Sequence, residues 1–273
     1  MNENSLDSGF GTLLRDRRTS RDLTQEQLSF RADLSTRHIS FLETGRSRPS
    51  RDSVLALAEA LELPLRDRNL LLEAAGFAAA YPARELTDPE RSHLRSLLSF
   101  VLERHEPYPC YVVDRCWNVE FHNEAGGRTL MWLLGEGVDG ADADDVNLLR
   151  LLFDPEGLRP CTVNFEEVAT SLLARLEREA AARPGDAELR ALLEELHRQA
   201  PAGSLEPGSR DAANLGSGDA PVLPIHLRRD GVDLRLFSMI MAVGTPRDVT
   251  VEELRVETFF PADPESEGVL REA

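Results

Sequence analysis

Apolar residues recur at helical spacing along the first 76 residues and predict five short helices. The fourth shows this best, because Val54, Leu57, Ala58 and Leu61 follow an i, i+3, i+4, i+7 pattern. Capping residues set the expected ends of the others. The predicted helices include one that contains Phe10, Leu13 and Leu14, and four more from Thr24 to Ala32, from Ser35 to Gly45, from Ser50 to Leu61 and from Pro64 to Gly76. Residues 1–76 are therefore expected to form an all-α domain.

The third helix divides its residues between two faces. A turn of about 100° per residue places Ile39 and Leu42 on the face that would serve a core. The opposite face then carries Thr36, Arg37, Ser40, Phe41 and Thr44. Two helices joined by a short turn, the second of which shows short polar side chains and an arginine, suit a DNA major groove.

Beyond Pro89 the pattern changes to a mixture of strands and helices. Strands are expected at "CYVVD" and "WNVEF", and again at "PIHLRR", "VDLRLFSMIMAVG" and "LRVETFFP". Helices are expected between these two groups, for example over residues 165–176 and 189–196. Two strands, several helices and three further strands predict an α+β domain, with one antiparallel sheet covered by helices.

Turn-rich stretches mark the expected boundaries of these domains. We expect a linker over residues 77–89, a second domain over residues 90–263 and a tail over residues 264–273. The stretch from Ala200 to Pro221 is rich in Gly, Pro, Ser and Asp and is interpreted as a mobile loop.

The charge distribution changes how the acidic composition is interpreted. The net charge of −17 disfavours nucleic acid as a partner of the whole chain. From Gly9 to Arg51, however, nine arginines face five acidic residues, which gives a local charge of +4. From Tyr81 onward, twenty arginines face thirty-six acidic residues, which gives −16. A basic N-terminal domain on an acidic body fits a small DNA reader joined to a domain with another task.

The residues from Leu23 to Pro49 resemble the helix-turn-helix of the XRE family, the lambda-repressor-like bacterial regulators. The pattern "LTQEQL…A…S…IS.LE.G…P" carries this resemblance. The resemblance implies that Thr36 and Arg37 face base edges and that Gln25, Arg46 and Arg48 contact the DNA backbone. It also implies an ion pair between Arg18 and Glu43. One departure is Asp33, which stands in the turn where the family often has glycine, and Asp tolerates the left-handed conformation comparatively well.

Ser40 and Phe41 complete the expected DNA-binding face. An arginine can hold guanine through two hydrogen bonds, and an apolar side chain can meet a thymine methyl group. For Phe41 two interpretations stay open: it contacts thymine, or it folds under the loop of residues 46–49.

The second domain resembles the MmyB-like regulators, in which an XRE domain precedes a PAS-like ligand-binding domain. The stretches "HNEAG", "NLLRLLFDPEG" and "GTPRDVTVEELRVETFFPAD" carry this resemblance. It implies a small apolar effector, with a fatty acid as the specific suggestion. The candidate ligand-binding residues are Trp117, Phe121, Trp132, Phe153, Leu172, Phe237, Met239 and Met241. Flexible thioethers suit adaptable pockets, but the alternative is that all of these residues are ordinary core.

Other classes of site lack sequence support. Neither His122 nor His226 belongs to a His-x-His pair, and the acidic stretch of residues 139–145 has Arg150 where a calcium loop needs glutamate. Cys110, Cys116 and Cys161 lack zinc-ligand spacing and are interpreted as free thiols. No phosphate-binding glycine loop or nucleophile motif is present, so we expect neither an enzyme nor a required cofactor.

The sequence therefore predicts a cytoplasmic transcription regulator without a membrane segment. We expect a homodimer on a pseudo-palindromic double-stranded operator, because one small reading domain buries limited area. The alternative is a DNA-binding repressor or antitoxin that a protein partner controls, with no small-molecule effector.

Overall fold

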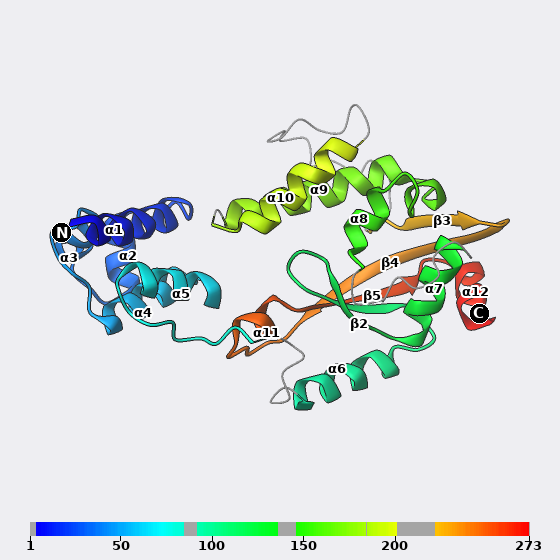
Figure 1. Cartoon of the computed structure of the whole chain (residues 1–273), viewed down its shortest axis with the longest axis horizontal. Coiled ribbons are helices and arrows are strands. Elements are labelled where there is room, and N and C mark those ends of the chain that lie inside the picture. Colours follow the sequence, from blue (N-terminus) through cyan, green and yellow to red (C-terminus); the bar gives the residue numbers. More distant parts are fainter. Residues whose placement is uncertain (1–3, 85–91, 136–145, 184, 201–221, 273) are drawn as a thin grey trace. The chain divides into compact units, whose positions relative to one another are not determined.

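The computed structural model describes residues 4–84, 92–135, 146–183, 185–200 and 222–272 (Figure 1). The chain divides into two compact units. The N-terminal unit comprises residues 1–85 and 244–252, and the C-terminal unit comprises residues 86–243 and 253–273. The expected acidic loop of residues 139–145, nearly all of the turn-rich stretch 200–221 and the end of the linker lie outside the described residues.

The described part of the N-terminal unit begins with five helices, as the sequence predicted. They are α1 (Asn4–Thr19), α2 (Gln25–Arg31), α3 (Thr36–Glu43), α4 (Arg51–Ala60) and α5 (Leu65–Ala74). The side chains of Thr24, Ser35 and Ser50 accept hydrogen bonds from backbone N–H groups three residues later. Thr24 also forms the full capping box with Gln27. Each hydroxyl satisfies a donor that the first helical turn leaves unpaired.

One core holds these helices together, and it includes Leu14, Leu28, Ile39, Leu42 and Leu57, all of them fully buried. Helix α1 crosses the end of α3 at Gly11, and this contact depends on a missing side chain. A Cβ atom at Gly11 would lie 2.7 Å from the carbonyl oxygens of Leu42 and Glu43. Asp33, in the turn between α2 and α3, has a φ of 52°, so the departure from glycine is accommodated there.

A buried ion pair also joins α1 to α5. The Arg17 guanidinium donates to Asp67 Oδ1 over 3.0 Å, and the two side chains are only 3% and 7% exposed. Nothing in the spacing of apolar residues along α1 indicates that Arg17 is buried.

Helix α5 begins at a position that lacks a side-chain cap. Its N-cap residue is Pro64, which makes no capping hydrogen bond. Glu252 supplies the acceptor instead, because its Oε2 receives the Leu65 backbone N–H over 2.6 Å. Glu252 belongs to α11 (Val249–Glu253), in which Val249 is 1% exposed and donates its N–H to Pro82. From the sequence, this stretch was expected within the second domain, residues 90–263.

The described residues of the C-terminal unit form one antiparallel sheet of five strands in the order β2-β1-β5-β4-β3. The strands are β1 (Cys110–Val113), β2 (Val119–His122), β3 (Ile225–Arg229), β4 (Val232–Ala242) and β5 (Arg255–Pro261). The predicted α+β class, with two strands before the helices and three after them, is confirmed.

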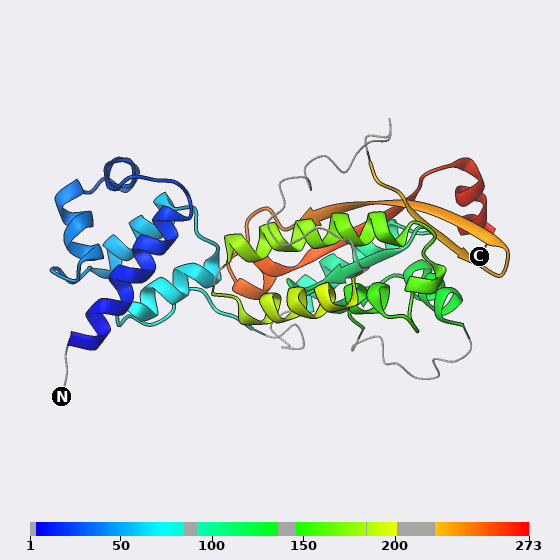
Figure 2. The same cartoon turned by 90° about the horizontal axis from the view of Figure 1, so that it is seen from above.

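Helices cover both faces of this sheet (Figure 1). On one face, α6 (Ser92–Arg104) packs through Leu98 and Leu102 against Val112 and Val256. The other face carries the larger core, and there α9 and α10 lie side by side (Figure 2). The helices of this layer are α7 (Glu124–Leu134), α8 (Leu148–Phe153), the 3-10 turn η3 (Arg159–Cys161), α9 (Phe165–Ala182) and α10 (Ala187–Gln199).

Two features of the C-terminal unit were not foreseen from the sequence. Strand β4 has a paired neighbour on both sides only at Leu236, because β3 pairs with residues 232–236 and β5 pairs with residues 236–242. The expected tail forms α12 (Pro264–Glu272), which packs on β4 and β5 and buries Leu270. The apolar spacing of α12 is short, and only contact with the sheet shows that it belongs to the fold.

Candidate DNA-binding helix and ligand pocket

Helix α3 turns one face inward and one face outward. Ile39 and Leu42 are completely buried, whereas Thr36 and Arg37 in the first turn are exposed. Ser40 and Phe41 are half-buried on the outward side. The cap is in place as well, since Ser35 Oγ accepts the His38 backbone N–H over 3.2 Å. The first turn of α3 therefore presents its side chains to solvent on a short, capped helix.

Arg37 and Phe41 lie one helical turn apart and contact each other. The guanidinium carbon of Arg37 lies 5.1 Å from the centroid of the Phe41 ring, a cation–π geometry. The Phe41 carbonyl also accepts hydrogen bonds from the backbone N–H groups of Arg46 and Ser47. These bonds fix the start of the loop that carries Arg46 and Arg48, both of which have exposed side chains.

The carboxylate of Glu43 joins the first three helices. Arg18 donates to both of its oxygens, over 2.6 and 3.0 Å, and these hydrogen bonds raise the pKa of Arg18. The side-chain amide of Gln25 donates to the same carboxylate over 2.9 Å, a contact that sequence reasoning missed. Thr36 is held in turn, because its Oγ1 lies 3.0 Å from Ser29 Oγ. These contacts fix Gln25 and Thr36 at the starts of α2 and α3.

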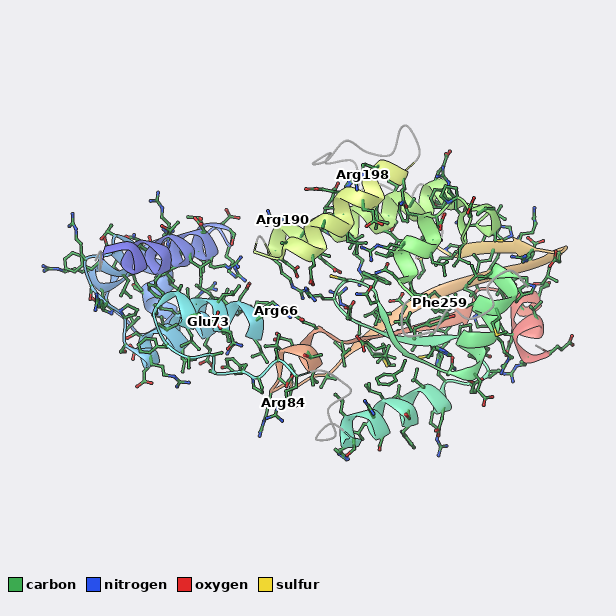
Figure 3. The ribbon with its side chains drawn as sticks, viewed as in Figure 1. Arg66, Glu73, Arg84, Arg190, Arg198 and Phe259 are labelled. Carbon is green, nitrogen blue, oxygen red and sulfur yellow. The ribbon has the colours of Figure 1, made fainter. Side chains whose placement is uncertain are left out.

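The C-terminal unit contains a mainly apolar cavity of about 130 Å³ on the face of the sheet opposite α6. Its apolar walls come from the sheet and from α7, α8 and α9. They include Leu130, Leu133, Leu148, Leu149, Leu152, Leu158, Leu172, Leu227, Leu236 and Phe259. Figure 3 labels Phe259 on β5.

The cavity also has a small set of residues with polar groups, namely Tyr111, Trp117, Thr129, Arg175, Ser238 and Glu257. Glu257 is 3% exposed, and its burial raises the pKa of its carboxyl group. A hydrogen bond with Ser238 and the charges of Arg175 and Arg255 oppose that rise. An apolar cavity with a few convergent polar groups is the usual form of a small-molecule site.

Only two of the eight residues proposed from the sequence, Trp117 and Leu172, line this cavity. Phe153 packs against Phe165 in the core at a ring distance of 5.5 Å. Phe121 packs with the α6 cluster, and Trp132 lines a neighbouring hollow with Val232 and Leu234.

The other three residues lie on the face of β4 opposite the cavity. Side chains alternate along a strand, so Leu236 and Ser238 point into the cavity and Phe237, Met239 and Met241 point away from it. Phe237 stacks on Phe260 at 5.4 Å. Met239 and Met241 are 57% and 44% exposed. The alternation defined two faces, but the sequence did not show which face the cavity would adjoin.

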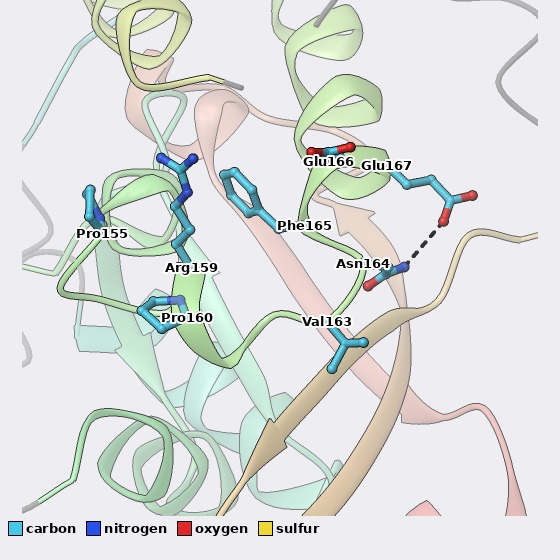
Figure 4. A pocket seen from close by; sticks show the side chains of 8 residues that line it. All are labelled: Pro155, Arg159, Pro160, Val163, Asn164, Phe165, Glu166 and Glu167. Carbon is cyan, nitrogen blue, oxygen red and sulfur yellow. Dashed lines mark hydrogen bonds between the residues drawn. The ribbon is translucent and has the colours of Figure 1, made fainter. Parts of the chain in front are cut away.

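A second depression lies at the surface around the start of α9 (Figure 4). Its Arg159 guanidinium stacks over the Phe165 ring at 4.8 Å and donates to the Gln199 carbonyl. Asn164 donates to Glu167 over 3.5 Å and to the Pro224 carbonyl over 2.8 Å. The hydrogen bonds of Arg159 and Asn164 thus already go to protein groups around a wide, shallow hollow. We therefore favour the apolar cavity as the ligand site.

The described residues hold no group of three or more His, Cys, Asp or Glu side chains arranged for a metal ion. His226 contacts Asp233, which also pairs with Arg228. Cys110, Cys116 and Cys161 are free thiols. No helix within the described ranges has the length and hydropathy of a membrane span.

Comparison with known proteins identifies both units. Residues 14–67 match the helix-turn-helix family, and residues 94–273 match the MmyB-like transcription regulator ligand binding domain. The chain belongs to the MmyB-like transcription regulators. An MmyB-like regulator combines a DNA-binding domain with a ligand-binding domain, and neither matched family is an enzyme family.

More distant comparisons add little to this assignment. No curated protein matches the chain. A solved structure of an RNA-binding light-oxygen-voltage receptor aligns with 98% of this chain at 17% identity, with a TM-score of 0.24. The alignment spans 60% of that receptor, and at this TM-score it carries no argument about fold or function.

Proposed function

We propose that this MmyB-like regulator reads DNA sequence through the outward face of α3. Thr36, Arg37, Ser40 and Phe41 would meet base edges in the major groove. Gln25, Arg46 and Arg48 would contact phosphates. The observation that carries this proposal is the exposure of Arg37 in the first turn of α3. On the opposite face of the helix, Ile39 and Leu42 are buried in the core.

The contact between Arg37 and Phe41 supports a joint role in base recognition. An arginine that stacks on an aromatic ring has less freedom to lose when it binds, and it keeps its donors for guanine. The Phe41 ring lies beside it, where it can meet a thymine methyl group. The two side chains together would read neighbouring base pairs.

We propose further that the cavity lined by Leu172 and Leu236 binds a small apolar or amphipathic effector. The apolar walls support an apolar ligand, and the few polar groups would orient it. A fatty acid is the candidate that the family resemblance suggests.

The remaining parts of the proposal concern assembly. Residues 1–76 would read DNA, and residues 90–263 would bind the ligand and form a homodimer. Two copies on a pseudo-palindromic operator would give useful affinity, because a single reading domain buries limited area. Because its proposed partner is double-stranded DNA, the protein would act in the cytoplasm.

Control by a protein partner is the second candidate function. It is favoured by the exposed apolar residues at the end of β4, where Met239, Ile240, Met241 and Val243 are between 37% and 57% exposed. Exposed apolar patches on proteins can mark interaction sites.

One experiment separates these functions. The operator is first selected from random duplexes with the full-length protein, and the affinity is then measured with and without an organic extract of the purified protein. A sensor predicts that mass spectrometry finds an extracted amphiphile and that this compound changes operator affinity. Affinity that responds only to added protein, with no amphiphile in the extract, would support the partner-controlled function.

A further inference from the structure

Two residues that line the apolar cavity each carry a buried polar atom without a hydrogen-bond partner among the residues that the structure describes. These atoms are Trp117 Nε1 and Glu257 Oε2. Both residues line the cavity, and they are 4% and 3% exposed. Buried polar groups in native proteins are nearly always paired, so each such atom calls for an explanation.

The two atoms have complementary hydrogen-bonding chemistry. An indole N–H can only donate, whereas an ionised carboxylate can only accept. A ligand group that offers both an acceptor and a donor would satisfy both atoms. Hydroxyl and amide groups have this property, and an ionised carboxylate does not.

The charges around this end of the cavity are already balanced. Glu179 pairs with Arg175 and with Arg255, each over 3.0 Å. The Arg175 guanidinium carbon lies 4.9 Å from the Trp117 ring centroid, and the charges of both arginines act on Glu257. Two arginines therefore face two carboxylates, and an anionic ligand would add a third negative charge beside Glu257. Burying an uncompensated charge is unfavourable.

The size of the cavity limits the ligand further. Its volume is about 130 Å³. An apolar cavity of ~150 Å³ holds benzene, so the closed part of the site has room for a short alkyl segment or a single ring.

We infer that this cavity selects a neutral amphiphile whose polar group is a hydroxyl or a primary amide, accepting from Trp117 Nε1 and donating to Glu257 Oε2. This inference rests on the proposed ligand-sensing function, but it replaces the ionised fatty acid suggested by the family resemblance with a neutral amphiphile. An ionised fatty acid meets the same end of the cavity without a donor and with an added negative charge.

The test compares probes that share one eight-carbon chain. Octan-1-ol, octanamide, octanoate and octylammonium are titrated into the full-length protein at pH 7.5 by calorimetry. We expect octan-1-ol and octanamide to bind at least tenfold more tightly than octanoate, and more tightly than octylammonium, which lacks an acceptor.

Three variants test whether Trp117 Nε1 and Glu257 Oε2 cause the preference for neutral probes. Trp117→Phe keeps an aromatic ring beside Arg175 but removes the donor, and it should weaken octanamide binding at least fivefold. Trp132→Phe is the matched control, because that indole lies outside the lining of the cavity and its loss should leave affinity unchanged. Glu257→Gln removes the negative charge and adds a donor, so octanoate should then bind nearly as tightly as octan-1-ol.

The outcomes separate this inference from the function on which it rests. Octanoate or octylammonium binding as tightly as octan-1-ol to the native protein would overturn the inference and leave the sensor intact. The same holds if Glu257→Gln does not change the ratio of the octan-1-ol and octanoate affinities. Failure of every probe to bind the native protein would overturn the inference and remove the support that the cavity gives to a sensor.

Discussion

The buried pair of Arg17 and Asp67 gives the sharpest prediction about stability. Both side chains are under a tenth exposed, and they join α1 to α5 over 3.0 Å. Asp67→Ala leaves the Arg17 charge buried without this partner, and Arg17→Met does the same to Asp67. Breaking a buried pair on one side costs about 3–5 kcal/mol.

That free energy is large for a unit of this size. In a domain of 60–100 residues, 1 kcal/mol shifts the melting temperature by roughly 4–8 °C. Each single variant should therefore lower the melting temperature of the N-terminal unit by about 12 °C or more. Replacing both residues, as Arg17→Met with Asp67→Leu, should recover most of the loss, because an apolar pair of similar volume carries no desolvation cost.

The chain allows the two units to be followed separately. Trp117 and Trp132 are its two tryptophans, and both lie in the C-terminal unit. Tryptophan fluorescence therefore reports melting of that unit, while circular dichroism also reports the five N-terminal helices. Arg15→Met is the matched control, since Arg15 is an exposed arginine on the same helix.

Two results would refute this reasoning. One is a change of less than about 1 kcal/mol in the single variants, which is the range of exposed pairs. The other is a double variant as unstable as the singles, which would show that the loss comes from packing volume rather than from an orphaned charge.

The remaining predictions concern DNA binding, helix packing and pH. Arg37→Ala should relax sequence preference by about 1–3 kcal/mol at one base pair, measured by anisotropy on operator variants; an equal loss on every duplex would contradict base readout. Gln25→Ala should weaken binding on all duplexes alike, and a loss confined to the selected operator would exclude a phosphate contact. Gly11→Ala should destabilise the N-terminal unit and abolish operator binding, because the new Cβ would lie 2.7 Å from two carbonyl oxygens of α3. The exposed Gly9, whose Cβ position has open space, supplies the control Gly9→Ala; similar melting curves for the two variants would argue against the close approach. Burial raises the pKa of Glu257 above its value in the unfolded chain. Protonated Glu257 therefore contributes its full share to the free energy of unfolding below pH ~4.5, and this contribution is lost as the pH rises through the folded pKa. The advantage of Glu257→Gln in urea unfolding should therefore grow between pH 4.5 and 7.5, and parallel pH profiles would contradict the raised pKa.

Local signals were sufficient for most of the N-terminal unit. The hydroxyls of Thr24, Ser35 and Ser50 bond to N–H groups three residues away, so the sequence contains both partners of each cap. The apolar spacing within α3 likewise assigned Ile39 and Leu42 to the core and left Arg37 outside. The pairing of Arg18 with Glu43 came from family resemblance, and the structure adds Gln25 to it.

In the C-terminal unit, local sequence signals were not sufficient to locate the ligand cavity. The alternation in β4 separated Met239 and Met241 from Leu236 and Ser238, but not the covered face from the open one. That choice depends on where β3 stops and on which helices pack on the sheet. The candidate polar end of the cavity was missed for the same reason, because Glu257 looks like an ordinary charged residue of a strand until its burial is known.

The sequence by itself determined the five N-terminal helices, the caps at Thr24, Ser35 and Ser50, the succession of strands and helices of an α+β class, and the outward face of α3. Each of these depends on residues within a few positions of one another. Only the tertiary structure decided the contacts between distant residues. Arg17 meets Asp67 fifty positions away, and Glu252 caps α5 at Leu65 from 187 positions away. The burial of a charge, the lining of a cavity and a cap from a distant residue all depend on which residues are neighbours in space. The spacing of residues along the chain does not predict these neighbours.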